Sequence, residues 1–470
     1  MILMLGVGYY FLRKNKNPDD YFVGGRKMKS MHVGLSVVAT DVGGGFSIGL
    51  GGLGFVMGIA GSWMLFTGLI GAWLTAVVLI PKVSRLSKKY QFYTFPQIFE
   101  HYYGRNVALL AGIISAIGYM GFTSSQILAG AKLASATFVN LDMTTALYLM
   151  GVIAVVYTVM GGLKAVIFTD TIQWIILMGG LIFIGIPIAF VKIGGMEAIR
   201  DTVSTGHLDL FNLTWQTFLN WVVTIIPIWF VGMTLYQRIY STPDKKTAQR
   251  AWYTAGLFEY PVMAFMGVLL GLFSRVAVDH GMFTELGYAT AEGLDSEKGL
   301  PLLLRTILPV GLMGLMMSAY FSAIMSTADS CLMASSGNIV TDIIGRFKKL
   351  TGQKYILRLS QIVTLIVGAF ALWLASSMEN VLNLMLYSYA FMVSGLFIPV
   401  LGAYYGKRHN PVAAYLAMFF GGGTTLVLTV AQFELPLGLD PNIFGITVSA
   451  LLFIVATLLL PSQNRYIADV

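Results

Sequence analysis

Long apolar runs, separated by short polar segments, follow one another along almost the whole chain. Twelve of these runs reach the roughly 20 residues that a helix needs to cross a bilayer, and several exceed it, so those helices are expected to tilt, kink or protrude. They cover residues 33–59, 62–81, 107–137, 143–160, 166–191, 214–237, 251–274, 302–340, 357–376, 380–405, 410–432 and 441–461. The pattern predicts an all-α polytopic membrane protein.

One further apolar run, residues 1–12, is too short to cross a membrane. It lacks the small-residue cleavage site of a signal peptide, so we interpret it as a helix whose beginning is missing. With this partial helix, the expected total is about 13 transmembrane helices.

The polar segments between the runs are short, so residues 1–470 are expected to form a single transmembrane domain. The first and sixth full runs are both interrupted, one by a series of glycines and the other by Pro227 and Gly232. Interruptions at matching places predict an inverted repeat with its binding site at the interface of the two halves. The repeats would cover residues 33–191 and 214–405, and two extra helices would follow at 410–461.

Composition agrees with a membrane protein, because only 11% of the residues are charged whereas soluble proteins have about 25%. The net charge of +8 raises nucleic acid as a partner, but 24 of the 30 basic residues fall in alternate short loops, at 13–29, 82–105, 164, 238–250, 346–358, 407–408 and 465. This bias predicts that those loops and the C-terminus are cytoplasmic and that the N-terminus is outside, as in a multi-pass protein of a bacterial inner membrane. We therefore expect a lipid bilayer and no nucleic acid as partner. The single cysteine, Cys331, excludes an internal disulfide framework and a Cys-rich metal site.

Residues 39–54 place a carboxylate, Asp41, and seven glycines inside an apolar run. Unwinding a helix in hydrocarbon is costly unless the freed carbonyls gain partners, such as a bound ion. An ionisable residue at that depth is itself a candidate functional residue. The segment therefore predicts a broken helix that holds an ion, with Asp41 as a possible ligand of the ion or of the substrate.

A second polar group lies in residues 322–330, where Ser326, Asp329 and Ser330 share one helix face. Hydroxyl, carboxylate and carbonyl oxygens suit hard cations. A Na⁺ ion could bind the carbonyls of Ala39 and Val42 and the hydroxyls of Ser326 and Thr327. Two other interpretations stay open, since such hydroxyls also hold membrane helices together and a buried carboxyl can be neutral and merely hydrogen-bonded.

Four segments resemble the sodium/solute symporter family: Asp-Asp-Tyr-Phe-Val-Gly-Gly-Arg at 19–26, the glycine-rich span at 39–54, residues 157–173 and Met-Ser-Thr-Ala-Asp-Ser at 325–330. The resemblance implies a LeuT-type fold with a 5+5 inverted repeat. It also implies that Na⁺ binds at Ala39, Val42, Ala323, Ser326 and Thr327. A second cation site, which some members have, would fall on Asp170, Ser326, Asp329 and Ser330.

The solute is less constrained. The local sequence resembles the choline-transporter branch, but Asp41 and Gly232 lie at positions where that branch has aromatic cage residues. The proline-transporter branch has Asp at the position of Asp41, and the Asn-Gln of sugar transporters reads Gly232-Met233 here. The resemblance therefore favours an amino acid or amine-like solute over a sugar. Candidate solute-binding residues, which could equally belong to the core, are Trp63, Phe122, Ser125, Gln126, Trp229 and Tyr236.

We therefore predict a Na⁺-coupled symporter that imports a small polar organic solute by alternating access, and not an enzyme. A proton-coupled carrier is the nearest alternative, because Asp41, Asp170 and Asp329 could carry protons. A channel or a sensor is a more distant one, since no repeated pore loop and no signalling module is evident. The sequence leaves the oligomeric state open.

Overall fold

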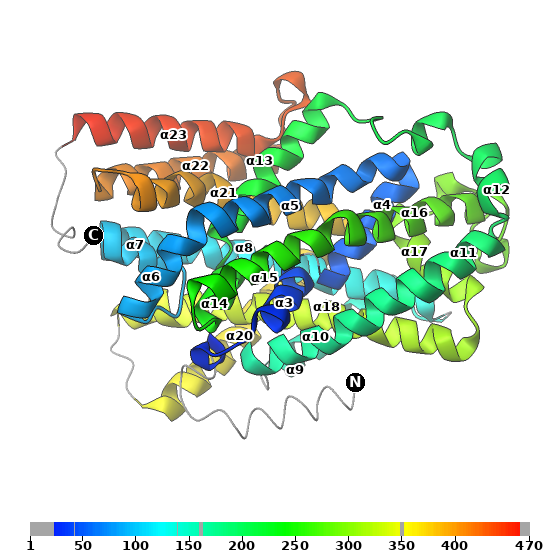
Figure 1. Cartoon of the computed structure of the whole chain (residues 1–470), viewed down its shortest axis with the longest axis horizontal. Helices are drawn as coiled ribbons and strands as arrows, with labels where there is room; N and C mark the ends of the chain where they lie inside the picture. Colours follow the sequence, from blue (N-terminus) through cyan, green and yellow to red (C-terminus); the bar gives the residue numbers. More distant parts are fainter. Residues whose placement is uncertain (1–22, 42, 139, 159–162, 348–351, 461–470) are drawn as a thin grey trace.

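A computed structural model describes residues 23–41, 43–138, 140–158, 163–347 and 352–460. The regular elements in these ranges are helices, and the long ones lie side by side along the long axis of the molecule (Figure 1). The predicted all-α membrane class is confirmed. The partial helix expected at residues 1–12 lies outside the described residues.

The first predicted span is divided. A short 3₁₀ turn, η1 (Gly24–Arg26), precedes α3 (Ser30–Asp41), and α4 (Gly43–Met57) follows after residue 42. Gly43 has a φ of +57°, which breaks the helix. The chain then continues through η2 (Gly58–Ser62), α5 (Trp63–Leu74), a π-helical turn η3 (Thr75–Leu79) and α6 (Ile80–Tyr90).

The next spans are regular. They are built from α7 (Pro96–Tyr103), α8 (Arg105–Thr137), α9 (Met143–Thr158), α10 (Leu163–Gly180), the π-helical turn η4 (Leu181–Gly185) and α11 (Ile186–Lys192). The short elements α12 (Gly195–Thr202) and η5 (Thr205–Leu208) then lead to the sixth span.

The sixth span is also divided, into α13 (Trp215–Val231) and α14 (Met233–Ser241), which meet at Gly232 with a bend of 44°. The second half continues with α15 (Lys245–Leu257), η6 (Phe258–Met263), α16 (Ala264–Asp279), η7 (Thr284–Leu286), η8 (Ala291–Gly293) and α17 (Ser296–Ile307). It ends with α18 (Val310–Asn338), η9 (Ile339–Ile344), α19 (Gly345–Phe347), α20 (Gln353–Ser376), α21 (Val381–Tyr405), α22 (Pro411–Ala431), η10 (Pro436–Gly438) and α23 (Pro441–Leu459).

The span count differs from the expected twelve. Among the described residues, nine helices are long and apolar enough to cross a membrane, or ten if the bent pair α13–α14 is one span. The continuous run Ser47–Tyr90 counts once, although its 44 residues would extend over roughly 66 Å, enough for both of the first two predicted spans. Helix α9 is not counted, because its 16 residues are fewer than the 18 required here of a spanning helix. The division into repeats at 33–191 and 214–405 stays a prediction.

Helix α8 forms the centre of the packing, where it contacts α18, α21, α20 and α9. Helices α21, α22 and α23 pack together at one edge, drawn in orange to red in Figure 1. The two broken helices are held inside this arrangement, because α3 contacts α10, α15 and α18 while α14 contacts α3 and α18.

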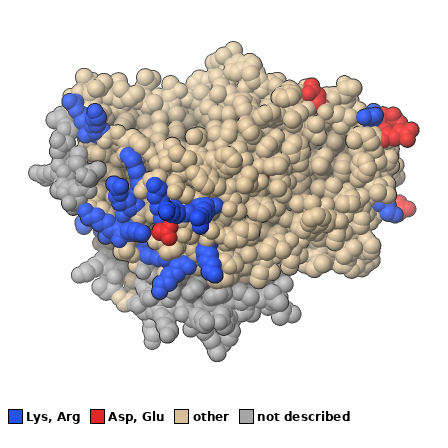
Figure 2. Space-filling view, viewed as in Figure 1, with Lys and Arg blue, Asp and Glu red and all other residues tan. Residues whose placement is uncertain are grey.

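Basic side chains gather at one end of the molecule, whereas the opposite end carries both signs (Figure 2). The exposed basic residues near α6 and at the start of α15 include Arg85, Lys88, Lys245 and Arg250. One basic residue that was expected in these loops lies elsewhere. Arg238, counted among the loop residues, is 0% exposed because α14 carries it into the interior.

Candidate functional site

The end of α3 faces α18 through a threonine. The Thr327 hydroxyl lies 2.9 Å from the carbonyl oxygen of Ala39 and 3.1 Å from that of Ala323, and it can donate to either. The approach is tight, because a Cβ added to Gly43 would lie 2.8 Å from Thr327 Oγ1. Three oxygens of the predicted sodium site therefore lie together at the break. Val42, whose carbonyl is also predicted to bind the ion, is outside the described residues.

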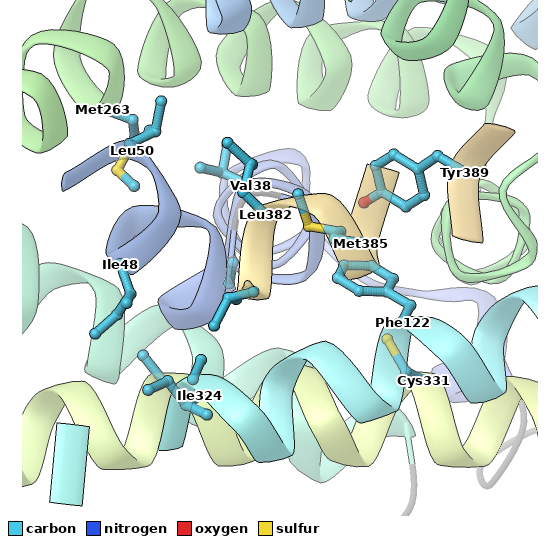
Figure 3. Packing of buried hydrophobic residues seen from close by; sticks show 14 of the residues in the cluster. Val38, Ile48, Leu50, Phe122, Met263, Ile324, Cys331, Leu382, Met385 and Tyr389 are labelled. Atoms are coloured by element: carbon cyan, nitrogen blue, oxygen red, sulfur yellow. The ribbon is translucent and has the colours of Figure 1, made fainter. Parts of the chain in front are cut away.

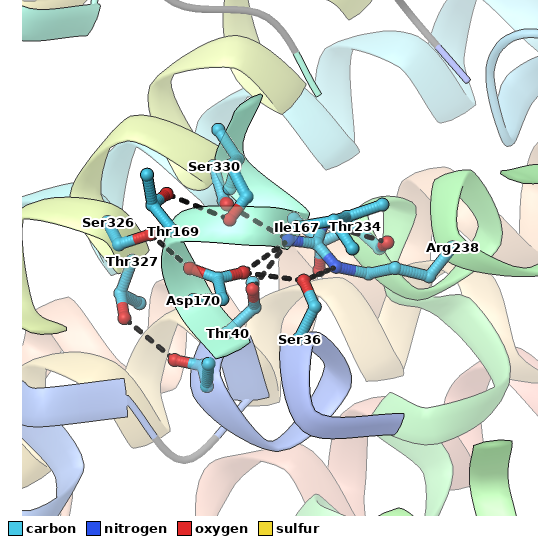
Figure 4. Close-up of polar contacts among 12 residues, drawn as sticks. Ser36, Thr40, Ile167, Thr169, Asp170, Thr234, Arg238, Ser326, Thr327 and Ser330 are labelled. Carbon is cyan, nitrogen blue, oxygen red and sulfur yellow. Dashed lines mark hydrogen bonds and ion pairs between the residues drawn. The ribbon is translucent and has the colours of Figure 1, made fainter. Parts of the chain in front are cut away.

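A second polar group surrounds Asp170 of α10, directly beside the first (Figure 4). Asp170 Oδ1 accepts a hydrogen bond from the Ser326 hydroxyl, and Oδ2 accepts one of 2.5 Å from the Ser36 hydroxyl of α3. Ser326 and Asp170 were both expected here, and the structure brings them into contact. Ser36 was missed, since a lone serine in an apolar helix carries no sequence signal.

Arg238 of α14 completes this group. Its Nη2 lies 3.7 Å from Asp170 Oδ2 and donates hydrogen bonds to Thr40 Oγ1 at 2.6 Å and to Ser330 Oγ at 3.1 Å. Its Nε donates to Ser36 Oγ at 3.3 Å. The guanidinium thus connects both broken helices with α10 and α18, and it provides the positive charge that a buried carboxylate needs.

The remaining carboxylates differ from one another. Asp329 is 1% exposed on α18, one turn from Ser326, and its Oδ1 has no hydrogen-bond partner among the described residues. It is therefore near the Asp170 group but not hydrogen-bonded into it through that oxygen. Asp41 ends α3, and its side chain lies outside what the structure describes.

The six candidate solute residues do not converge. Trp63 lies at the start of α5, where its indole donates to the carbonyl of Leu210 and packs edge-on against Phe218. Trp229 packs edge-on against Trp252. These tryptophans occupy separate aromatic contacts, which is how core and interface residues behave.

Tyr236 lies in α14, after the break in the sixth span. Its hydroxyl donates to the carbonyl of Phe230 at 2.9 Å, and its ring lies 4.5 Å from that of Phe95. The side chain of Tyr236 therefore packs α14 against Phe230 of α13 and against Phe95.

The other three candidates share α8 and are buried. Phe122 meets Tyr389 of α21 edge-on, with ring centroids 5.1 Å apart, and Val38 and Met385 lie close by (Figure 3). Ser125 donates to the carbonyl of Phe122 and accepts from Gln126. Phe122 thus packs between α8 and α21.

Tyr119, which the sequence analysis missed, holds the break in the sixth span. Its hydroxyl oxygen accepts the backbone N–H of Thr234 at 3.1 Å and lies 2.9 Å from the Thr234 hydroxyl. The second amide of α14 has no partner within its own helix, so this contact satisfies it. The signal that could have found Tyr119 is a polar aromatic facing a helix break from a continuous neighbouring span.

Replacing Tyr119 by Phe is expected to lower the free energy of unfolding by about 1–3 kcal/mol, because it leaves the buried Thr234 amide unsatisfied. The measurement is the thermal unfolding midpoint of the purified variant. Tyr148→Phe serves as the control, since this side chain is 56% exposed. Equal midpoints for the two variants would contradict the role of Tyr119.

Comparison with known proteins identifies the family of this chain. The sequence model of the Sodium:solute symporter family matches residues 21–421. The chain belongs to this family. It is therefore a Na⁺-coupled symporter of small solutes, as predicted, and not an enzyme; Na⁺ is the coupling ion rather than a cofactor. Family membership favours this activity over the proton-carrier, channel and sensor alternatives.

Relatives of the symporter share most of its length. It is 26% identical to the high-affinity proline transporter PutP of Bacillus subtilis (strain 168), over 90% of this chain and 89% of that protein. It is also 26% identical to the sodium/sialic acid symporter SiaT of Proteus mirabilis (strain HI4320), over 97% and 92%. A solved structure of a Na⁺-coupled sialic acid symporter in a substrate-bound outward-open state matches with a TM-score of 0.79 and 21% identity, over 98% and 96% of the two chains. The fold is thus that of this transporter class.

Proposed function

We propose that this symporter imports a small amino acid together with Na⁺ by alternating access, with proline as the first solute to test. The observation that supports the coupling site is the contact of Thr327 with the carbonyl of Ala39, where α3 breaks. The sodium ligands would be Ala39, Val42, Ala323, Ser326 and Thr327.

The chemistry of this group suits Na⁺. Carbonyl and hydroxyl oxygens are hard donors, and a neutral set binds the ion reversibly, as coupling requires. Ala39 belongs to the broken helix and Thr327 to the continuous α18. An ion shared between these two helices would favour one arrangement of the broken helix, and so change the affinity of a solute that binds at the break.

An amino acid is favoured by the relative that bears the name of a proline transporter and by the carboxylate at position 41. The rings of Phe122 and Tyr389, which meet edge-on, would offer an apolar contact to a pyrrolidine ring. The sialic acid relative shows that family membership alone does not choose the solute.

The orientation is part of the proposal. The basic end, which includes Lys88 and Lys245, would face the cytoplasm, as the distribution of positive charge in membrane proteins indicates. The end that carries α12 and α17 would then face outward in a bacterial inner membrane.

Replacing Thr327 by Val is expected to raise the Na⁺ concentration for half-maximal proline uptake at least about tenfold, since it removes one ion ligand and keeps the shape; such a loss corresponds to about 1.4 kcal/mol. Uptake into proteoliposomes measures this. Na⁺ should also raise the unfolding midpoint of the wild type relative to K⁺, because a ligand at 100 times its Kd stabilises by about 2.7 kcal/mol. That shift should shrink in the variant.

Thr364→Val is the matched control, because in the described part of the chain this buried hydroxyl donates within its own helix α20, to the carbonyl of Ser360. The control should keep wild-type Na⁺ dependence. Unchanged Na⁺ dependence in Thr327→Val would remove Thr327 from the site. Na⁺-driven uptake of another amino acid but not proline would keep the sodium site and overturn the choice of solute.

A further inference from the structure

Arg238 is a permanent positive charge in the interior of a membrane protein. A guanidinium stays protonated in proteins, and burying such a charge is expensive unless it is paired and hydrogen-bonded. Here the side chain is 0% exposed and donates to Ser36, Thr40, Thr234 and Ser330. This number of contacts indicates a built position rather than a side chain that was merely trapped (Figure 4).

The guanidinium stands where a second cation would have to bind. Of the four residues predicted for that site, Asp170 accepts from Ser36 and Ser326 and faces Arg238, and Ser330 accepts from Arg238. The oxygens of these side chains are thus already directed at donors. Asp329, the fourth residue, keeps an Oδ1 without a hydrogen-bond partner among the described residues, but the Arg238 guanidinium already supplies the positive charge beside Asp170, where a second Na⁺ would have to bind.

We propose that Arg238 is a tethered cation that replaces a second Na⁺, so that this symporter binds one sodium ion only. The inference rests on the proposed sodium site at Ala39 and Thr327 and adds the ion count to it.

Electrostatics supports the exclusion. An ion bound by both Asp170 and Ser330 would lie within a few ångströms of Arg238 Nη2, which is 3.7 and 3.1 Å from their oxygens. Two unit charges about 4 Å apart at an effective dielectric of about 20 repel strongly enough to weaken binding by a factor on the order of a thousand. The hydrogen bonds of the guanidinium go to Ser36, Thr40, Thr234 and Ser330, so Arg238 does not occupy the first sodium site at Ala39, Ala323 and Thr327.

The test is the amount of ²²Na⁺ bound per molecule of purified protein at saturation, which requires no solute. The wild type is expected to bind one ion. Arg238→Lys keeps the charge and should also bind one. Arg238→Gln removes the charge and should bind a second ion, with steeper dependence on Na⁺. Asp170→Asn should still bind one, because Asp170 serves Arg238 rather than the ion.

A wild type that binds two ions, falling to one in Asp170→Asn, would overturn the proposal. One bound ion in both the wild type and Arg238→Gln would show that Arg238 does not set the number of bound Na⁺ ions. That result would overturn the proposal as well. If Arg238→Gln does not fold, the wild type and Asp170→Asn still decide between one ion and two. A wild type that binds no Na⁺ would overturn the proposed sodium site itself, so the two failures are distinguishable.

Discussion

Replacing Glu297 by Ala is expected to lower the free energy of unfolding by about 3–5 kcal/mol. Glu297 is 1% exposed at the start of α17, and its Oε2 accepts from Lys132 Nζ of α8 at 2.7 Å. Its two oxygens also accept the first two amides of α21, those of Val381 and Leu382, at 2.9 and 3.0 Å. The substitution would leave the buried Lys132 with one partner and both amides without one. The thermal unfolding midpoint of the purified variant measures the loss.

Asp295→Asn is the matched control for this experiment. Asp295 also pairs with Lys132, at 2.7 Å, but its side chain is 36% exposed, and ion pairs in contact with water contribute about 0–1 kcal/mol. Asn can still accept the Glu297 amide that Asp295 caps at the start of α17. A loss in Asp295→Asn as large as in Glu297→Ala would show that Glu297 has no special part in joining α17 to α8 and α21.

The helices could be predicted because each one needs about 20 apolar residues, and that requirement is local in the sequence. The break at Gly43 could be predicted for a similar reason, since glycines and a carboxylate in an apolar run indicate irregular backbone. The contact of Ser326 with Asp170 needed more than local pattern; it followed from the family resemblance, which assigned both residues to one site.

Arg238 and Tyr119 could not be predicted, because their roles depend on partners far away in the sequence. Arg238 lies seven residues before Lys245 and so resembled the edge of a basic loop, yet its partners come from α3, α10 and α18. Tyr119 contacts Thr234, which is 115 residues away. The solute candidates Trp63 and Trp229 lie in separate aromatic contacts. The sequence could not show this, because an aromatic residue at helical spacing gives the same pattern in a core as in a pocket.

Replacing Gly271 by Ala is expected to destabilise the protein by about 3 kcal/mol or more, because it separates two helices that touch through their backbones. A Cβ on Gly271 of α16 would lie 2.0 Å from the carbonyl oxygen of Gly51 of α4, and real Cβ atoms do not approach within 3.0 Å. No side chain can rotate to relieve this contact, so α4 must move away from α16. Gly54 repeats the arrangement, with its Cβ position 2.1 Å from the carbonyl oxygen of Val268.

The measurement is the unfolding midpoint together with Na⁺-dependent stabilisation, and Gly337→Ala is the control. Gly337 lies within α18 with nothing within 4 Å of its Cβ position, so alanine there should be neutral or stabilise by up to about 1 kcal/mol through helix propensity. Because α4 continues from the break beside Thr327, a shift of α4 should also weaken Na⁺ binding in Gly271→Ala. Loss of stability with unchanged Na⁺ affinity would mean that the two halves of the broken helix move independently of each other.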